Sequence, residues 1–300
     1  MTDERDEFSF LPDDARDVGR TDPLPEVRRV EVDAGDGRVS ALAWGPSPAR
    51  VVLLHGAALN AHTWDATVLA GGFAALALDL PGHGDSAWRD DGDYGPETLG
   101  PVVARALDRW VSHGLVERGA TLVGQSLGGL IGAVVAAYDP GLVAHLVLVD
   151  ILPLPPGAAR EVEAFLAGPA EFASRDEIVA RALAFGLGGG RDRLERGVHL
   201  NTRVRPDGTV VWKHHLATLG GRAVLRLDAD TLWTTIEGLG IPVDLVRAGR
   251  GLLTAEAAAE LTRRSPGARA VVVDAGHNIQ EDAPVELAGV LTELIGRDVS

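Results

Sequence analysis

The pentapeptide Gly124-Gln125-Ser126-Leu127-Gly128 constrains this fold more than any other stretch of the chain. An apolar run from Thr121 to Val123 precedes it and predicts a buried strand, and the small apolar residues from Leu130 to Ala137 predict a packed helix. Glycines two positions before and after a serine allow a sharp strand-to-helix turn with strained backbone angles at the serine. The pattern therefore predicts a Ser126 hydroxyl raised clear of a sheet beside a helix N-terminus, where an oxyanion can be stabilised.

The same pentapeptide is compatible with other structural roles. A glycine-rich turn between a strand and a helix can merely pack or can cradle a phosphate, and short Gly/Ser motifs recur by chance. The strand before Gly124 and the helix after Gly128 favour a nucleophilic serine over both alternatives.

Buried strands alternate with helices along most of the chain, which predicts an α/β fold with a mainly parallel sheet. A β-hairpin is expected over Val30–Trp44, and further strands at Val51–Leu54, Phe73–Leu78, Thr121–Val123, Val143–Val149, Val243–Val246 and Ala270–Val273. Helices are expected at Trp64–Leu69, Pro101–Val116, Leu130–Ala137, Thr254–Arg263 and Pro284–Ile295.

The alternation is interrupted between residues 152 and 236. Amphipathic helices are expected there at Arg160–Leu166, Arg175–Phe185 and Arg191–Val198, with a turn at Arg205–Gly208. We interpret residues 152–236 as an inserted helical lid and residues 26–151 and 237–300 as the core. Residues 1–25 are rich in charges and prolines, so we expect a loosely ordered acidic arm.

Composition limits the possible partners and the compartment. The formal net charge is -15, which argues against binding nucleic acid, and the absence of cysteine excludes disulfides and thiolate metal sites. The acidic start lacks the apolar stretch of a secretory signal, and no apolar run is long enough to span a bilayer. We expect a cytoplasmic protein without membrane insertion; a homodimer is left open.

A serine hydroxyl needs a base, and the base needs an acid partner that selects its tautomer. His277 is the main candidate base because it follows the expected strand Ala270–Val273 in a Gly-His loop, one helix before the C-terminus. An arbitrary histidine is more often structural, but His277 completes the chain order serine, acid, histidine.

Four motifs in order make the chain resemble the α/β-hydrolase superfamily from about Val30 onward: His55–Ala58, Asp79–Ser86, the Ser126 pentapeptide and Gly276-His277. The resemblance implies a sheet of about eight strands flanked by helices, with a lid inserted after the sixth strand. It also implies an oxyanion hole made by the backbone N–H groups of Ala57 and Leu127.

The position of the acid departs from the commonest pattern of the superfamily. The turn Arg247–Gly251, where the acid usually lies, holds no carboxylate. Asp150 follows the strand Val143–Val149, and its separation from Ser126 resembles that of the acid in haloalkane dehalogenases and zearalenone-type lactonases. We assign Asp150 as the acid; Asp150 as a cap of the following proline turn, Glu256 and Asp244 remain alternatives.

A serine nucleophile forms an acyl-enzyme, so the resemblance implies a serine hydrolase, an esterase or lactonase that cleaves a small, largely apolar substrate. The alternatives are a carbon–carbon hydrolase or lyase, a perhydrolase, and a non-catalytic ligand-binding module of the same fold. No cofactor or metal is expected: the sequence shows no cluster of metal ligands, and Gly188–Gly190 lacks the preceding strand of a dinucleotide site.

Side chains near the catalytic loops and in the lid are candidates for contact with the substrate. Each of the aromatic residues is individually more typical of plain packing, and Gln125 and Asn278 can equally bond local backbone. The candidates are Trp64, Trp88, Gln125, Trp212 and Asn278, with Phe165, Phe172, Phe185 and Trp233 as further lining residues.

Overall fold

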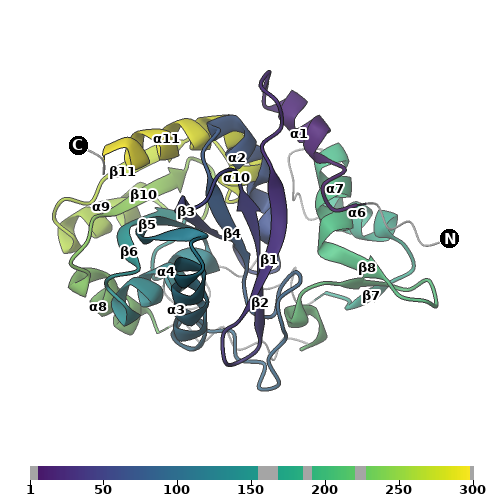
Figure 1. Cartoon of the computed structure of the whole chain (residues 1–300), viewed down its shortest axis with the longest axis horizontal. Coiled ribbons are helices and arrows are strands. Elements are labelled where there is room, and N and C mark those ends of the chain that lie inside the picture. Colours follow the sequence, from purple (N-terminus) through teal and green to yellow (C-terminus); the bar gives the residue numbers. More distant parts are fainter. Residues whose placement is uncertain (1–5, 155–167, 185–190, 220–227, 298–300) are drawn as a thin grey trace.

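The computed structural model describes residues 6–154, 168–184, 191–219 and 228–297. Its centre is an eight-stranded sheet of order β1-β2-β4-β3-β5-β6-β10-β11 (Figure 1). The β1–β2 and β2–β4 pairs are antiparallel and the other pairs are parallel. The strands are β1 Val27–Asp33, β2 Arg38–Trp44, β3 Ala49–Leu54, β4 Ala75–Asp79, β5 Val116–Gln125, β6 Val143–Val149, β10 Val243–Ala248 and β11 Ala270–Val273.

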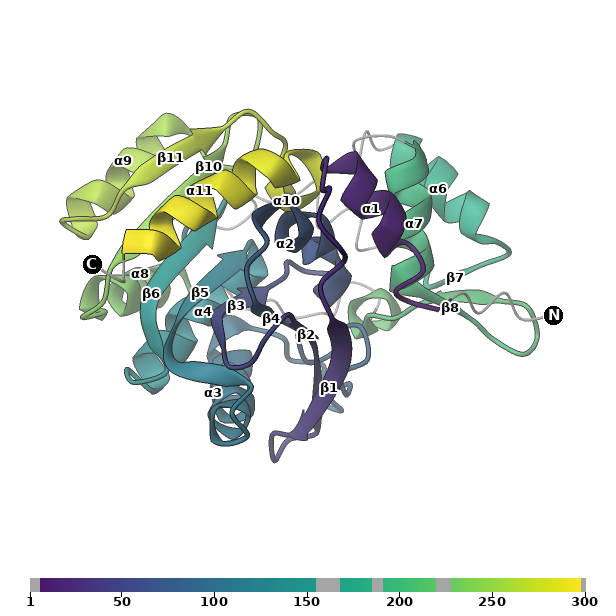
Figure 2. The ribbon, with the colours of Figure 1, turned by 45° about the horizontal axis from the view of Figure 1, so that its top comes forward.

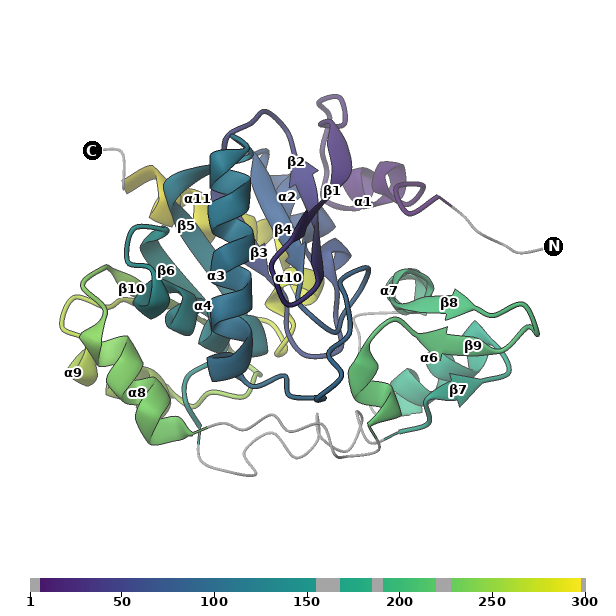
Figure 3. The same cartoon turned by 60° about the horizontal axis from the view of Figure 1, so that its bottom comes forward.

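Helices cover both faces of this sheet because its central strands are apolar on both sides. Figure 3 shows α3 (Pro96–Ser112) and α4 (Leu127–Tyr138) in front of one face, with α8 (Ala229–Gly238) beside them. Figure 2 shows α2 (Asp65–Gly71) and α11 (Pro284–Arg297) in front of the other face. Two separate clusters of buried apolar residues correspond to these two layers. The expected α/β fold is confirmed.

The shorter elements lie at the sheet's margins and in its loops. They are η1 (Ala61–Trp64), α9 (Ala255–Arg264) and α10 (Ile279–Asp282). None of the helices in the described ranges is both long enough and apolar enough to cross a membrane.

The described part of the insertion after β6 contains a small three-stranded sheet that the sequence pattern does not predict. Helices α6 (Arg175–Ala184) and α7 (Arg191–Asn201) pack on strands β7 (Glu171–Phe172), β8 (Thr202–Val204) and β9 (Val210–Trp212), followed by η2 (His215–Thr218). We call residues 168–219 the cap. Its β8–β9 hairpin closes at the expected turn, where Gly208 has a φ of 88°. The cap is therefore not purely helical, since β-branched residues on both sides of that turn pair as strands.

The expected lid also differs from the structure at its C-terminal end. Helix α8 falls inside the expected lid, yet its Leu232 and Ile236 belong to the core cluster on the α3–α4 face. The expected helix at Arg160–Leu166 lies outside the described residues.

The described start of the chain, from residue 6, is ordered rather than a loose arm. Helix α1 (Leu11–Asp17) buries Leu11 and Ala15 against the core cluster that contains α2 and α11. Two apolar side chains four residues apart on one face of a short helix are enough to dock it. The many charged residues among residues 1–25 predict a loose arm, because an average over the segment gives little weight to two apolar side chains.

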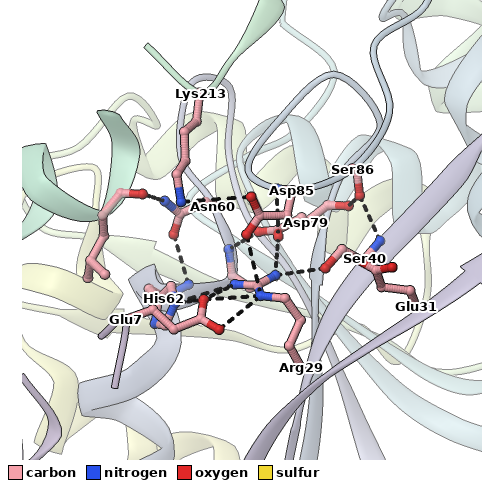
Figure 4. A network of polar contacts seen from close by, with 12 residues as sticks. Glu7, Arg29, Glu31, Ser40, Asn60, His62, Asp79, Asp85, Ser86 and Lys213 are labelled. Atoms are coloured by element: carbon pink, nitrogen blue, oxygen red, sulfur yellow. Dashed lines mark hydrogen bonds and ion pairs between the residues drawn. The ribbon is translucent and has the colours of Figure 1, made fainter. Parts of the chain in front are cut away.

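Charged side chains connect the start of the chain to the core beneath the cap. The Arg29 guanidinium lies 2.5 Å from Glu7 and 2.6 Å from Asp79, and Figure 4 shows this group at the centre of the network. His62 Nε2 lies 3.1 Å from Glu7, and its Nδ1 lies 2.8 Å from Asp65. Burial alone would lower the pKa of His62, but Asp65 and Glu7 outweigh it and raise that pKa to about 9.

The same network reaches the cap through Arg196 of α7. Its guanidinium lies 2.8 Å from Asp14 of α1 and 2.8 Å from Asp65 of α2. Nearby, the Asn60 amide donates to the Leu200 carbonyl and to Asn201 Oδ1, both of α7. The N-terminal segment, the core and the cap therefore share one set of buried polar contacts, which orients the cap on the core.

Because the pKa of His62 is raised, the free energy of unfolding should decrease as the pH becomes alkaline. A histidine whose folded pKa exceeds its unfolded value of 6.5 contributes stability below pH 6.5, and this contribution is lost as pH rises through about 9. The unfolding free energy of the wild type should therefore fall by roughly 3 kcal/mol between these pH values, and we expect His62→Asn to abolish this fall. Urea unfolding of both proteins at pH 6.5 and pH 9 measures it, with the exposed His113→Asn as control. Equal pH dependence in wild type and His62→Asn would contradict the assignment.

Candidate active site

The serine pentapeptide forms the sharp turn that its glycines predict. Ser126 lies between β5 and α4 with φ 52° and ψ −124°, a strained combination for a residue with a side chain. An ideal Cβ on Gly124 would lie 2.4 Å from the Gly128 carbonyl oxygen, and one on Gly128 would lie 2.5 Å from the Leu54 carbonyl oxygen. Both glycines are therefore required by close backbone approach, and the start of α4 is held against the end of β3.

Backbone strain is concentrated at this site. Among the described residues other than glycine, the three with positive φ are Ala58 at 63°, Ser126 at 52° and Asp150 at 48°. They follow β3, β5 and β6, neighbouring parallel strands whose carboxyl ends share one edge of the sheet. Each such conformation costs on the order of 1–3 kcal/mol and is retained mostly where function requires it.

Of the two residues expected to form an oxyanion hole, Leu127 directly follows Ser126, and Ala57 adjoins Gly56, which lies beside Ser126. Leu127 is the first residue of α4, so its N–H has no acceptor within the helix. Gly56 lies beside the serine, since an ideal Cβ on Gly56 would be 3.1 Å from Ser126 Cβ. Ala57 follows Gly56 directly and is partly exposed. The loop after β3 therefore lies next to Ser126.

His277 pairs with Asp150. The distance from His277 Nδ1 to Asp150 Oδ2 is 2.8 Å, the Asp150 side chain is completely buried and that of His277 is 20% exposed. Asp150 extends from the end of β6 and His277 lies in the loop after β11, with β10 between the two strands. The other ring nitrogen of His277, Nε2, lies 3.2 Å from Gln125 Nε2.

The turn after β10 supports Asp150 rather than supplying a carboxylate. Backbone N–H groups of Ala248 and Leu252 donate to Asp150 Oδ1 and Oδ2, each at 2.9 Å. An ideal Cβ on Gly251 would lie only 2.0 Å from Asp150 Oδ2. The turn Arg247–Gly251 thus forms a cradle for the Asp150 carboxylate, which follows the neighbouring strand β6.

We expect Gly251→Ala to displace the Asp150 carboxylate, because the added methyl group overlaps Oδ2. A shift of about 1 Å in a catalytic group costs on the order of 10²-fold in rate, so kcat on an ester should fall by about that factor. The control must be a glycine whose replacement causes no strain of its own, which excludes Gly267 with its φ of 102°. Gly289→Ala is suitable, since nothing lies within 4 Å of its added Cβ. Unchanged activity in Gly251→Ala would contradict the cradle.

The other two carboxylates left open by the sequence have different surroundings. Asp244 is buried against His145 at 3.2 Å and bonded by Arg269. Burial would raise its pKa, but the hydrogen bonds from His145 and Arg269 outweigh burial and lower the pKa to about 2. Glu256 is exposed on the first turn of α9 beside Thr254. In the described part of the chain, Asp150 is the carboxylate that contacts His277.

The polar candidates Gln125 and Asn278 lie against the histidine. Gln125 Nε2 is 3.2 Å from His277 Nε2, 3.3 Å from the His277 carbonyl oxygen and 3.2 Å from Asn278 Oδ1. Asn278 Nδ2 also donates to Glu281 at 3.4 Å. In this structure both side chains form hydrogen bonds within the loop that carries His277 and the start of α10.

The aromatic candidates are dispersed. Trp64 is a correction: it is fully buried in the core cluster on the α2 face, so it offers no surface to a substrate. Trp88 is 36% exposed and stacks on His215 of the cap with ring centroids 4.5 Å apart. Trp212 packs edge-on against Phe172 inside the cap.

The remaining lining candidates give little support to a common pocket. Trp233 lies on α8 with the Arg264 guanidinium 4.8 Å above its ring. Phe165 and Phe185 lie outside the described residues. Burial of large aromatic side chains cannot be predicted from a loop position, because it depends on which element packs over them.

Sequence reasoning missed the residues that support the site. The Gly251 cradle and the Arg196 contacts from the cap were not identified, and neither was the loop contact in which His215 N–H donates to the Gly82 carbonyl at 2.8 Å. The two glycines at positions 249 and 251 were the available signal for the cradle, since close backbone approach is a common reason for glycine.

Comparison with known proteins gives consistent matches. A model of the Alpha/beta hydrolase family matches residues 51–290. Esterase Rv0045c of Mycobacterium tuberculosis is 38% identical over 300 residues, which covers 95% of this chain and 94% of that protein. The crystal structure of that esterase has a TM-score of 0.85 and 37% identity, covering 99% of this chain and 100% of its own. A 3-hydroxybutyrate-oligomer hydrolase of Cupriavidus necator is 28% identical over 276 residues, covering 85% and 92%.

Proposed function

The chain belongs to the alpha/beta hydrolase family, and from that premise we propose that it is an esterase whose nucleophile is Ser126, with His277 as base and Asp150 as acid. The observation that carries the proposal is the 2.8 Å contact between His277 Nδ1 and buried Asp150, in a chain whose Ser126 lies on a strained turn. A relative named as an esterase over nearly the whole chain supports the same reaction class.

In the proposed reaction His277 Nε2 removes the Ser126 proton as Oγ attacks the ester carbonyl. Asp150 accepts from Nδ1, which selects the tautomer whose Nε2 is unprotonated and stabilises the imidazolium that forms. The N–H groups of Ala57 and Leu127 bind the oxyanion of the tetrahedral intermediate. His277 then donates its proton to the leaving alcohol, and water activated by the same base hydrolyses the acyl-enzyme.

We assign residues 168–219 to a cap that limits the substrate. The cap contacts the loops at the carboxyl ends of the strands: the Tyr94 hydroxyl lies 2.7 Å from His215 Nδ1, and the Asn60 amide bonds α7. A cap held over the strand ends leaves limited room for a substrate, so we propose small esters as the substrate class, cyclic esters included. The relative that hydrolyses 3-hydroxybutyrate oligomers supports ester substrates of short acyl units.

A two-stage experiment tests this function. Stoichiometric labelling of the protein with a fluorophosphonate reports an activated serine, and a panel of p-nitrophenyl esters and lactones reports turnover. Labelling at Ser126 with turnover of esters supports the proposal. Labelling without turnover on either class would favour a ligand-binding module, and release of acid from a carbon–carbon substrate alone would favour the lyase reaction.

A further inference from the structure

The amide of Gln125 contacts the nitrogen that receives the Ser126 proton. Gln125 is the last residue of β5, immediately before the nucleophile, and its side chain is buried. The Gln125 Nε2 group lies 3.2 Å from His277 Nε2. Because Nδ1 of the same ring is directed to the Asp150 carboxylate, Nδ1 carries the proton and Nε2 offers a lone pair to the amide.

The orientation of the amide follows from its neighbours. Three acceptors surround its nitrogen: His277 Nε2, the His277 carbonyl oxygen and Asn278 Oδ1. The opposite orientation would direct the carbonyl oxygen at two other oxygen atoms, which is unfavourable. The observed orientation leaves Gln125 Oε1 buried without a partner in the described structure. An unpartnered buried oxygen is costly, so the contacts of the nitrogen must outweigh it.

The position of Oε1 is matched by a glycine. An ideal Cβ on Gly56 would lie 2.1 Å from Gln125 Oε1, so any larger residue at position 56 would displace the amide. The loop after β3 and the loop after β11 thus enclose the same carboxamide from two sides.

From this geometry we infer that Gln125 is a positioning residue that acts through His277: its amide donates to Nε2 in the resting enzyme and so favours the neutral base over the imidazolium. A hydrogen bond made to the neutral form of a group opposes its protonation. The amide releases Nε2 when the Ser126 proton arrives. The inference rests on the proposed function for its kinetic part only.

Other charged groups near His277 are the same in the variants compared below. They are Asp150 after β6, Glu281 and Asp282 on α10, and the Arg250–Asp274 pair in the loops after β10 and β11. A difference between variants at position 125 therefore reports the amide and not these charges.

The test replaces the amide by a thioether of similar shape, Gln125→Met. Loss of one neutral hydrogen bond to the base should move the midpoint of the His277 titration upward by about 0.7 pH unit, a fivefold change in proton binding. The acid limb of kcat/KM for a p-nitrophenyl ester should shift in the same direction. A merely structural defect would instead lower kcat/KM at every pH and leave the position of the acid limb unchanged.

Gln280→Met is the matched control. Gln280 is also buried, lies three residues beyond His277 and has an unpartnered Oε1, but its amide nitrogen donates to Thr63 Oγ1. The control should leave the His277 titration and the acid limb unchanged. An equal shift in both variants, no shift, or a downward shift in Gln125→Met would overturn the inference.

The titration is measured by NMR of protein labelled in its histidine rings, with the His277 signal assigned by its loss in His277→Asn. This readout needs no turnover, so an inactive wild type refutes the proposed esterase while the role of Gln125 is still decided. If Gln125→Met fails to fold by circular dichroism, Gln125→Asn serves instead, because its shorter side chain withdraws the donor from Nε2.

Discussion

Replacement of Ser126 by alanine is expected to lower kcat on a short ester by about 10⁶-fold, the loss reported for removal of a nucleophilic serine from a triad. The reason is that the base and the acid have no substitute oxygen to activate, and only the oxyanion hole and substrate binding remain. Alanine differs from Ser126 only by the missing hydroxyl, so it fits the partly exposed, strained turn without overlap. Folding should be preserved.

The measurement is steady-state hydrolysis of p-nitrophenyl acetate, with circular dichroism and thermal unfolding to compare the folded states. Ser86→Ala is a control serine, since its hydroxyl donates to the Asp79 carbonyl at the end of β4, accepts from the Ser40 N–H and has no place in the proposed reaction. Activity of Ser126→Ala near that of wild type would refute the proposed nucleophile and with it the acyl-enzyme.

The second large effect is expected for Asp150→Asn, which should reduce kcat by about 10⁴-fold. Asp150 Oδ2 accepts from both His277 Nδ1 and the Leu252 N–H. An amide nitrogen in that place would oppose the Leu252 N–H and force Nδ1 to accept, which selects the wrong tautomer of His277. The buried side chain keeps nearly the same shape, so the loss should appear in kcat more than in folding.

Glu256→Gln and Asp244→Asn are the matched comparisons for Asp150→Asn. Glu256 is exposed on α9, so its variant should keep nearly full activity and stability. Asp244 is bonded by Arg269 and His145, so its variant should lose stability and keep kcat. If Asp150→Asn stays active while Glu256→Gln does not, the acid has been misassigned. If all three stay active, His277 acts without a carboxylate partner.

The motifs around the site could be predicted because each is a short local pattern with a steric or chemical cause. The glycines around Ser126 are required by backbone atoms only a few residues away or at the end of the next strand, so the turn is encoded locally. Alternating apolar runs and amphipathic segments likewise determined the parallel sheet and its covering helices. The match to the Alpha/beta hydrolase family over residues 51–290 confirms the resemblance.

The cap and the N-terminal segment were predicted less well. The charges of residues 1–25 suggested a loose arm, yet Leu11 and Ala15 pack on the core and Glu7 joins the network around Arg29. In the cap, strands of two or three residues pair around a turn, too short for periodicity to reveal. Both errors arise because a few apolar or charged contacts outweigh the average composition of a segment.

Local sequence patterns are enough to predict the strand-turn-helix at Ser126, the strands that precede Asp150 and His277, and the order of these residues along the chain. Which carboxylate meets His277 depends on the three-dimensional arrangement, because three carboxylates are compatible with the pattern and the strand order brings one of them to 2.8 Å. The tertiary structure also decides that Gly251 makes room for Asp150 and that Gln125 contacts His277 Nε2. These contacts join residues about a hundred or more positions apart, and local patterns carry no information about such pairs.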